Sequence, residues 1–408
     1  MSVEITEGGE VHIYGRGRLG SRPRIGILTS GGDCPGLNAV IRATTKTAYW
    51  LGYDVVGFRD GFEGLIDPIR YQVLSPRNTA GILIQGGTIL GSTNKGRFAA
   101  RIGESGRAEI DSKLIDRVAA TIDRLQIEGL IVVGGDGSLS TALQFHEAGI
   151  PVVGVPKTID NDLKCTAYTF GFNSAVLCCT DALDRLHTTA ASHERVMVLE
   201  VMGRHTGWIA LHGGIAGGAD VILIPEIGWT YENILAKIKE RREHGKNFTL
   251  IVVAEGAHLP SGGLVVDADG SQNKQVRLGG IGQVVTDHLE QMCDQDVRCV
   301  VLGHLQRGGG PTTFDRVLAS EYGAHAVRLI IERKFGQMVC SDPPDICDVP
   351  IADAVDQIRT VDPNGSAVQT ARAMGMCFGD TPGYQNPFVT TNEKRLSPLP
   401  KARDSTGV

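Results

Sequence analysis

Several features that mark secreted, zinc-binding or membrane proteins are missing from this sequence. Its nine cysteines are an odd number and no two stand at C-x-x-C spacing, so we predict neither a disulfide framework nor a zinc site. No apolar run approaches the roughly 20 residues that span a bilayer, so we expect no membrane helix. The polar stretch from Met1 to Glu10 lacks the apolar core of a signal peptide. We therefore expect a location in the reducing cytoplasm.

A surplus of positive charge is also missing. With a formal net charge of -6, the chain is not expected to have nucleic acid or an anionic membrane as its main partner. Glycine is abundant, with 53 of 408 residues, and the remaining composition is typical of a globular enzyme. The length suggests two or three domains. An anionic substrate would have to be bound by a local basic cluster.

Apolar, β-branched segments alternate with helical patterns along the chain. We expect strands at 24–28, 54–58, 129–133, 150–155, 195–201, 221–224, 248–253 and 297–302. We expect helices at 38–50, 112–125, 174–187, 232–243, 281–292 and 319–333, and a loop with a hairpin at 258–279. This alternation predicts an α/β protein with mainly parallel, doubly wound sheets. Such sheets bind ligands at the carboxyl ends of their strands.

Three glycine-rich loops lie between the expected strands and helices, at 29–38 (TSGGDCPGLN), 86–97 (GGTILGSTNKGR) and 134–138 (GGDGS). A strand, a glycine-rich turn and a helix form the arrangement in which backbone N–H groups receive a phosphate. The first loop matches neither G-x-x-x-x-G-K-[ST] nor a clean G-x-G-x-x-G. The loops therefore indicate phosphate binding without a common nucleotide fingerprint.

The stretch 155–162 (VPKTIDND) places a lysine, a hydroxyl and two carboxylates where an expected strand ends. Asp160 and Asp162 are two residues apart, so they share a face in an extended loop. Such a pair can hold a metal ion or take a proton from a hydroxyl. Asp-Asn-Asp is also common turn chemistry, so a solvated acidic turn is the alternative for this stretch alone.

Two later loops carry basic side chains, at 202–208 (MGRHTGW) and 303–310 (GHLQRGGG). Arg and His suit a phosphorylated small molecule, because Arg binds phosphate bidentately. The loops that carry Gly and Asp suit a nucleotide and Mg²⁺. Every candidate follows a strand, and in a two-lobed α/β protein such strand ends can face each other across a cleft that holds the active site.

Six stretches follow one another in a specific order. They are TSGGDCPGLNAVIR (29–42), GGDGS (134–138), PKTIDND (156–162), SHER (192–195), EVMGRHTG (200–207) and VLGHLQRGG (301–309). In this order they make the sequence resemble the ATP/pyrophosphate-dependent 6-phosphofructokinase family, from about Arg24 to about Gln357. GGDG alone also occurs in NAD kinases and diacylglycerol kinases, so the ordered set carries the resemblance.

The resemblance implies transfer of the ATP γ-phosphate to the 1-hydroxyl of fructose 6-phosphate in glycolysis, with Mg²⁺ as cofactor. The residues implied for catalysis are Asp160 as the base, Thr158 and Asp162 beside the transferring group, Arg204, and Gly32 as a backbone donor. Those implied for the sugar phosphate are Met202, Gly203, Arg204, Glu255, His304 and Arg307, with Arg195 and Arg298 reaching it from a neighbouring subunit. Those implied for the donor are Gly32, Asn94, Lys95, Gly135, Asp136, Gly137 and Ser138, with Asp136 as the Mg²⁺ carboxylate.

The resemblance also implies two Rossmann-like lobes. The nucleotide lobe would hold 24–171 and 306–356, and the fructose 6-phosphate lobe 172–305 and 357–380, between an N-terminal arm (1–23) and a C-terminal tail (381–408). If Arg195 and Arg298 serve a neighbouring subunit, the active site exists only in a homo-oligomer, either a dimer or a tetramer. The tetramer is the form that we expect.

Two positions that separate the donor classes of the family disagree. Gly137 matches ATP-using members, because a carboxylate there would occupy and repel the space of the nucleotide's α-phosphate. Lys157 matches pyrophosphate-using members, although longer ATP-using members combine Gly with Lys. We therefore favour ATP. The alternatives are a pyrophosphate-dependent fructose 6-phosphate 1-phosphotransferase and a non-catalytic regulator that binds a nucleotide or sugar phosphate.

The sequence departs from short bacterial members in two places. Asn94 falls about where they carry Arg, so Lys95 or Arg97 is expected to take that role. The family's effector site is expected to bind phosphate more weakly, because two of its arginines are replaced; its positions here are Arg42, Lys46 and His187.

Overall fold

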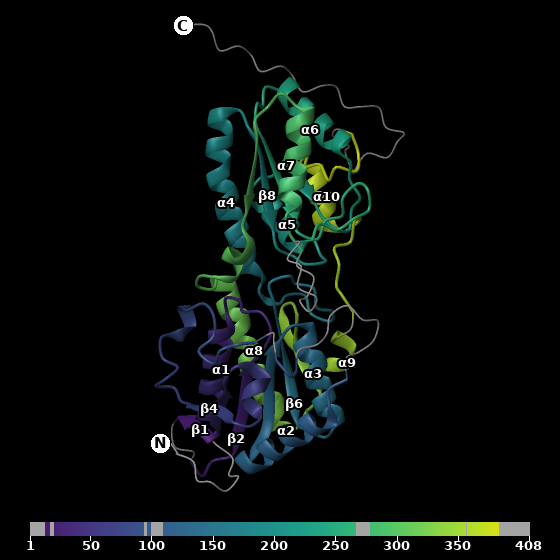
Figure 1. The fold of residues 1–408 in the computed structure, drawn as a ribbon. Coiled ribbons are helices and arrows are strands. Elements are labelled where there is room, and N and C mark those ends of the chain that lie inside the picture. Colours follow the sequence, from purple (N-terminus) through teal and green to yellow (C-terminus); the bar gives the residue numbers. More distant parts are fainter. Residues whose placement is uncertain are drawn as a thin grey trace, which may run out of the picture.

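The computed structural model describes residues 13–16, 20–93, 96–98, 109–266, 278–355 and 357–382. Two sheets with flanking helices occupy the lower and the upper lobe of Figure 1. Most strand pairs are parallel, so the predicted α/β class is confirmed. In the parts that are described, no helix has the length and apolar character that crossing a bilayer requires.

The larger sheet lies in the lower lobe and has the order β1-β4-β3-β2-β5-β6-β12-β13, with β7 beside β6. Its strands are β1 (Ile13–Arg16), β2 (Arg24–Thr29), β3 (Asp54–Phe58), β4 (Ile69–Leu74), β5 (Ile127–Gly134), β6 (Val152–Thr158), β7 (Phe170–Gly171), β12 (Gln337–Asp342) and β13 (Asp345–Pro350). The helices of this lobe are α1 (Leu37–Trp50), α2 (Ser112–Leu125), α3 (Asp136–Glu147), α8 (Thr313–Ile331) and α9 (Ile351–Ala354), with the short 3₁₀ turns η1 (Gly61–Leu65) and η2 (Ile82–Ile84).

The smaller sheet lies in the upper lobe and is parallel throughout, with the order β11-β8-β10-β9. Its strands are β8 (Val196–Val201), β9 (Val221–Leu223), β10 (Thr249–Ala254) and β11 (Val297–Val301). Its helices are α4 (Phe172–His193), α5 (Trp208–Ala216), α6 (Tyr231–Glu243), α7 (Ile281–Met292) and α10 (Ser366–Ala373). Strands β8 and β10 are buried at every position, because helices cover both faces of a parallel sheet.

The structure corrects several expectations. Strand β6 continues to Thr158, so Lys157 and Thr158 are strand residues and not loop residues. Helix α8 begins at Thr313 and not at 319, because Thr312 caps it by accepting a hydrogen bond from the N–H of Asp315. Strands β4, β12 and β13 were not predicted, and β1 lies in the expected arm. Residues 383–408 lie outside the described part, so most of the expected tail stays untested. Residues 267–277 of the expected loop with a hairpin also lie outside it, but an antiparallel bridge pairs Val266 with Leu278 on either side of them.

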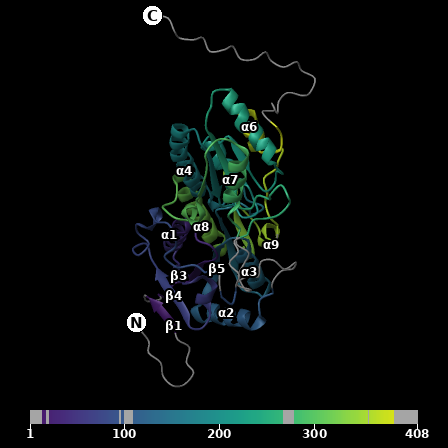
Figure 2. The same cartoon turned by 45° about the horizontal axis from the view of Figure 1, so that its top comes forward.

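The chain passes between the two sheets at three places: from β7 into α4, from β11 through η3 (Gly303–Arg307) into α8, and from α9 to α10. Helices α4 and α8 meet where Asp315 accepts hydrogen bonds from the N–H and the hydroxyl of Ser174, at 2.8 and 2.5 Å. Helix α1 lies alongside α8 (Figure 2), and Thr44 donates to the carbonyl of Gly323 at 3.3 Å. The residue limits of the two lobes remain a prediction.

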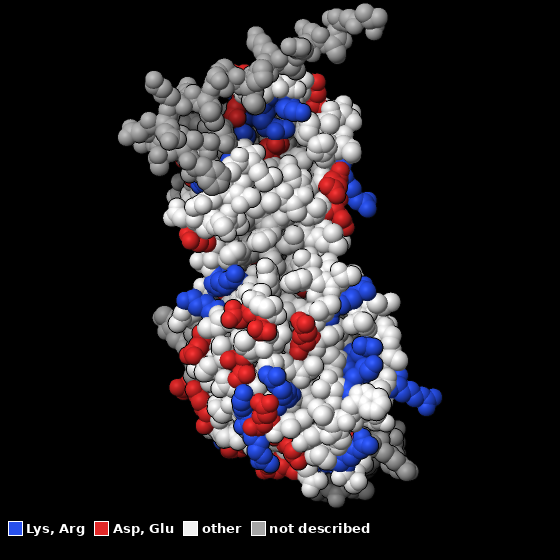
Figure 3. Space-filling model, turned by 180° about the vertical axis from the view of Figure 1, so that it is seen from behind, with Lys and Arg blue, Asp and Glu red and all other residues white. Residues whose placement is uncertain are grey.

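From behind, the molecule is narrower between the lobes, and basic and acidic side chains are interspersed over the lower lobe (Figure 3). This mixture of charges agrees with the small net charge of -6. Charge that selects an anionic ligand is therefore expected inside the site and not over this face.

Candidate active site

The turn between β2 and α1 brings backbone groups to the strand ends of the larger sheet. The N–H of Ser30 donates to the carbonyl of Val133 in β5 at 2.9 Å, which fixes the turn beside that strand. Gly36 caps α1 with a φ of 110°, and a Cβ there would lie 2.7 Å from the Phe170 ring. Only glycine fits this position. Gly32, the predicted backbone donor, lies within this turn.

The turn between β5 and α3 lies next to the first one. Gly135 is the N-cap of α3, and Asp136 is its first residue. A Cβ built on Gly31 would lie 3.5 Å from both Ser138 Oγ and Lys157 Nζ. The two turns and the lysine therefore meet at the N-terminus of a helix, which favours an anionic group.

Lys157 is buried between the turns, with 3% of its surface exposed. Its Nζ donates to the carbonyl of Gly32 at 2.5 Å. Burial lowers the pKa of Lys157, and the nearby Arg307 lowers it further, whereas Asp160 opposes the shift. The lysine is thus held by the glycine-rich turn and is within the electrostatic reach of the predicted base.

Asp160 is the best candidate for a base in the described part of the chain. It is 5% exposed, and its Oδ2 accepts a hydrogen bond from Thr158 Oγ1 at 3.3 Å. Its Oδ1 is buried and has no hydrogen-bond partner among the described residues. Thr206 of the upper lobe donates to the backbone carbonyl of Asp160 at 3.3 Å. A buried carboxylate with one oxygen unused is suited to accept a proton.

Asp162 lies close enough to Asp160 for their charges to interact. Burial raises the pKa of Asp162 to about 7, the charge of Asp160 contributes, and Arg204 opposes the shift. Asp162 therefore gives up its proton at a higher pH than an ordinary carboxyl group. Because Thr158 and Arg204 also interact with it, the structure brings together four of the five predicted catalytic residues.

The loop after β8 carries the predicted sugar contacts. The N–H of Met202 donates to Gln306 Oε1 at 2.7 Å, and the N–H of Arg204 donates to Glu255 Oε1 at 3.1 Å. Gly203 and Arg204 both adopt positive φ, of 150° and 56°. Gln306 is almost completely buried. It was missed in the sequence because its role depends on a bond 104 residues away.

Glu255 provides a test of the electrostatics of this loop. Burial raises its pKa to about 7, and the charge of Asp160 adds to the effect. An unfolded Glu titrates near ~4.3, so the stability of the fold declines as pH rises from about 4 to about 7. We expect Glu255→Gln to stabilise the protein at pH 8 by on the order of 2 kcal/mol, with the gain vanishing toward pH 4.

Melting temperatures measured at both pH values would check this, with Glu243→Gln on the exposed side of α6 as the matched control. Equal melting temperatures for wild type and Glu255→Gln at pH 8 would contradict it. The same change should raise the KM for a sugar substrate, because the amide accepts fewer hydrogen bonds than the carboxylate.

The 3₁₀ turn η3 brings Arg307 against the first glycine-rich turn. Arg307 Nη1 donates to the carbonyl of Asp33 at 3.1 Å, and a Cβ on Gly32 would lie 2.8 Å from the same Nη1. His304 of the same turn is exposed. Arg307 follows the smaller sheet and contacts the first glycine-rich turn of the larger sheet. It therefore connects the predicted donor-binding side of the site with the predicted sugar-binding side.

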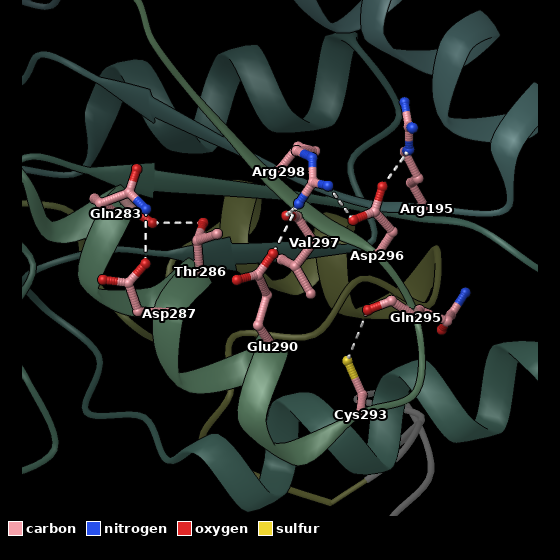
Figure 4. A network of polar contacts seen from close by, with 11 residues as sticks. Arg195, Gln283, Thr286, Asp287, Glu290, Cys293, Gln295, Asp296, Val297 and Arg298 are labelled. Atoms are coloured by element: carbon pink, nitrogen blue, oxygen red, sulfur yellow. Dashed lines mark hydrogen bonds and ion pairs between the residues drawn. The ribbon is translucent and has the colours of Figure 1, made fainter.

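Arg195 and Arg298 both point toward Asp296 (Figure 4). Arg195 Nε donates to Asp296 Oδ2 at 2.7 Å, and Arg298 pairs with the other oxygen of Asp296 and with Glu290. Both arginines lie at the start of β8 and β11, whereas Met202 follows the end of β8. The strand separates the two sets by roughly 20 Å. Within one chain they do not reach the site, and their role toward a neighbouring subunit stays a prediction.

The structure does not place several of the other predicted residues in the site. Asn94 and Lys95 lie outside the described residues. Arg97, the other candidate for that role, forms an ion pair with Glu63 at 2.8 Å. At the expected effector position, the His187 ring packs edge-on against Phe248.

Glycine-rich turns at a helix N-terminus, a buried lysine and a carboxylate pair between two α/β sheets define a phosphoryl-transferring enzyme. The turns suit a phosphate donor, and the unused oxygen of Asp160 suits an acceptor hydroxyl. The chain belongs to the phosphofructokinase family, whose model, described as "Phosphofructokinase", matches residues 24–330.

Named relatives and solved structures agree with this membership. The chain is 51% identical over 359 residues to the ATP-dependent 6-phosphofructokinase of Chloroflexus aurantiacus, covering 88% of this chain and 98% of that one. It is 48% identical over 364 residues to ATP-dependent 6-phosphofructokinase 2 of Clostridium perfringens, with 88% and 98% covered. The phosphofructokinase of Pichia pastoris in the T-state matches with a TM-score of 0.70 and 30% identity, over 88% of this chain and 36% of that longer one.

Proposed function

We propose that the protein is an ATP-dependent 6-phosphofructokinase, which transfers the γ-phosphoryl group of ATP to the 1-hydroxyl of fructose 6-phosphate. The observation that carries the proposal is the position of Asp160. Its buried, unpartnered oxygen lies just after the end of β6, where Lys157 contacts the glycine-rich turn on one side and the upper-lobe loop contacts the backbone of Asp160 on the other. Phosphoryl transfer needs placement and charge more than covalent chemistry, and this arrangement supplies both.

The residues divide the reaction between them. Asp160 takes the proton of the attacking hydroxyl, and Thr158 keeps the carboxylate in place through its 3.3 Å hydrogen bond. Gly32 and Ser138 hold the donor phosphates, and Arg204 neutralises charge on the transferring group. Glu255 and Met202 orient the sugar, and His304 and Arg307 bind its 6-phosphate. Each of these roles needs only the side chain or N–H that the residue already presents.

Mg²⁺ fits the donor side as an ion that arrives with the nucleotide. The described residues contain no group of three or more His, Cys, Asp or Glu placed to hold a metal ion. Mg²⁺ commonly uses one or two carboxylates together with substrate phosphates, so Asp136 at the start of α3 is a sufficient protein ligand. When bound, the ion neutralises phosphate charge.

ATP is favoured as the donor by Gly137 and by the similarity to relatives named ATP-dependent 6-phosphofructokinases. Lys157 does not oppose this choice, because its ammonium group is already bound to the Gly32 carbonyl. We propose further that the enzyme acts in cytoplasmic glycolysis as a homo-oligomer, a dimer or a tetramer. In that assembly Arg195 and Arg298, which share Asp296, would complete the active site of a neighbouring subunit.

A donor assay tests this proposal. Purified protein with Mg²⁺ and fructose 6-phosphate should form fructose 1,6-bisphosphate with ATP at least about 100-fold faster than with pyrophosphate, the factor that a few kcal/mol of donor discrimination gives. Activity with pyrophosphate alone would show that pyrophosphate is the donor, as in the family members whose pattern Lys157 matches. If neither donor supports turnover while the protein binds ATP, the interpretation as a regulator would hold.

A further inference from the structure

The third passage between the lobes, residues 357–361, is a feature that the proposed chemistry leaves unused. We call it the crossing segment. It runs from α9 to α10 along one side of the molecule (Figure 1) and lies beyond residues 24–330 of the family match. A connection of this kind needs no specific contacts if it only links two lobes. Here nearly every residue of the segment forms one.

One side of the crossing segment is bound to the loop that carries the proposed base. Ile358 forms an antiparallel bridge with Leu163, and the N–H of Arg359 donates to the carbonyl of Asp162 at 2.8 Å. Arg359 Nη1 donates to the carbonyl of Ala167 at 2.8 Å. The crossing segment is thus hydrogen-bonded to the loop of Asp160, and these bonds begin two residues after Asp160.

The other side is bound to the loop that carries the sugar contacts. The Arg359 guanidinium lies over the Trp208 ring, 4.6 Å from its centre. The backbone carbonyl of Arg359 accepts a hydrogen bond from Trp208 Nε1 at 2.9 Å. Glu226 Oε1 accepts the N–H of Val361 at 2.9 Å and the N–H of Gly207 at 3.0 Å. Gly207 and Trp208 end the loop that begins at Met202, so both bonds act directly on that loop.

The contacts of Arg359 hold its side chain in one position. Burial lowers its pKa, and its guanidinium donates to a backbone carbonyl, that of Ala167. A desolvated guanidinium over a Trp ring is stabilised by the cation–π contact, and its N–H groups need acceptors in fixed directions. Moving the crossing segment by even 1 Å would therefore break bonds on both sides at once.

We propose that the crossing segment, through Arg359 and Glu226, sets the separation between the loop of Asp160 and the loop of Met202 to Gly207. Both are positioning residues, since neither contacts the reacting atoms. Among the described residues, one hydrogen bond joins the upper-lobe loop directly to Asp160: Thr206 donates to its backbone carbonyl at 3.3 Å. Because a base and an acceptor hydroxyl must lie within hydrogen-bond reach, an error of about 1 Å in this separation can cost about 100-fold in rate. The inference rests on the proposed function.

Arg359→Ala tests the inference, with Arg372→Ala as the matched control. Arg372 also lies over an aromatic ring, that of Phe378 at 4.8 Å, and pairs with Asp380, but it belongs to α10 and is bound to neither loop. We expect Arg359→Ala to lower kcat by about 10–100-fold and to raise the KM for fructose 6-phosphate, with the KM for ATP unchanged. Arg372→Ala should lose a comparable amount of thermal stability and keep all three constants.

Two conservative variants keep the test decisive if Arg359→Ala does not fold. Arg359→Lys retains a cation over Trp208 and should recover part of the lost kcat. Glu226→Gln keeps the volume and one acceptor and should shift kcat and the KM for fructose 6-phosphate in the same direction by a smaller factor. If the folded variants are less stable but keep kcat and both KM values, the crossing segment is only a linker and the inference is wrong. If the wild-type protein does not phosphorylate fructose 6-phosphate, it is the proposed function that fails.

Discussion

Replacing Asp160 by Asn should lower kcat by about 10²–10⁴-fold, the range that follows the removal of a positioned base. Asn keeps the volume of the side chain and can still accept the hydrogen bond from Thr158 through its amide oxygen. It cannot take a proton from the attacking hydroxyl, because its amide does not become protonated near neutral pH. The rate should be measured with saturating fructose 6-phosphate and MgATP.

The loss should appear in kcat and not in substrate affinity. In the proposed site, fructose 6-phosphate is bound by the upper-lobe loop and by the arginines, which this change leaves in place. The melting temperature should not fall, since a buried carboxylate is replaced by a neutral amide of equal size. A kcat within about three-fold of the wild-type value, well below the expected range, would remove Asp160 from the role of base.

The position of Asp160 near a strand end could be predicted from the local sequence, whereas its role as the base came from the resemblance of six ordered stretches. An apolar run ends at Val155, and polar residues follow close to the strand end, which is where α/β sheets bind ligands. Asp136 could be placed for the same reason, at the junction of β5 and α3. The expected end of β6 at residue 155 was wrong, because Lys157 and Thr158 are polar residues that nevertheless continue a buried strand.

The missed parts depend on distant contacts or on weak patterns. Strand β4 reads IRYQVL, and its alternation is short because the strand pairs antiparallel to β3 near the edge of the sheet. The role of Arg359 depends on an acceptor 192 residues earlier, in Ala167. Asp296, which joins Arg195 to Arg298, was likewise an ordinary surface aspartate in the sequence. Spacing along the chain carries no information about such partners.

Gly137→Asp should lower kcat/KM for ATP by about 10²–10³-fold. Like charges brought together at a binding site cost several kcal/mol, and about 1.4 kcal/mol corresponds to a factor of ten. Gly137 is the second residue of α3, where the helix dipole favours an acidic side chain by about 0.3–1 kcal/mol. The variant should therefore fold at least as well as the wild type, and its defect should be specific to the donor. Steady-state kinetics with varied ATP would measure it.

Gly137→Asn separates the two reasons for the loss. Asn has nearly the shape of Asp without its charge, so it should retain more activity if repulsion of the nucleotide phosphates dominates, and equally little if its volume does. In either case the KM for fructose 6-phosphate should stay near the wild-type value, because the proposed sugar contacts lie on the loop after β8 and on η3. If both variants use ATP as well as the wild type does, residue 137 does not control donor access. The choice between ATP and pyrophosphate would then depend on Lys157, whose bond to the Gly32 carbonyl positions its charge at the glycine-rich turn in either case.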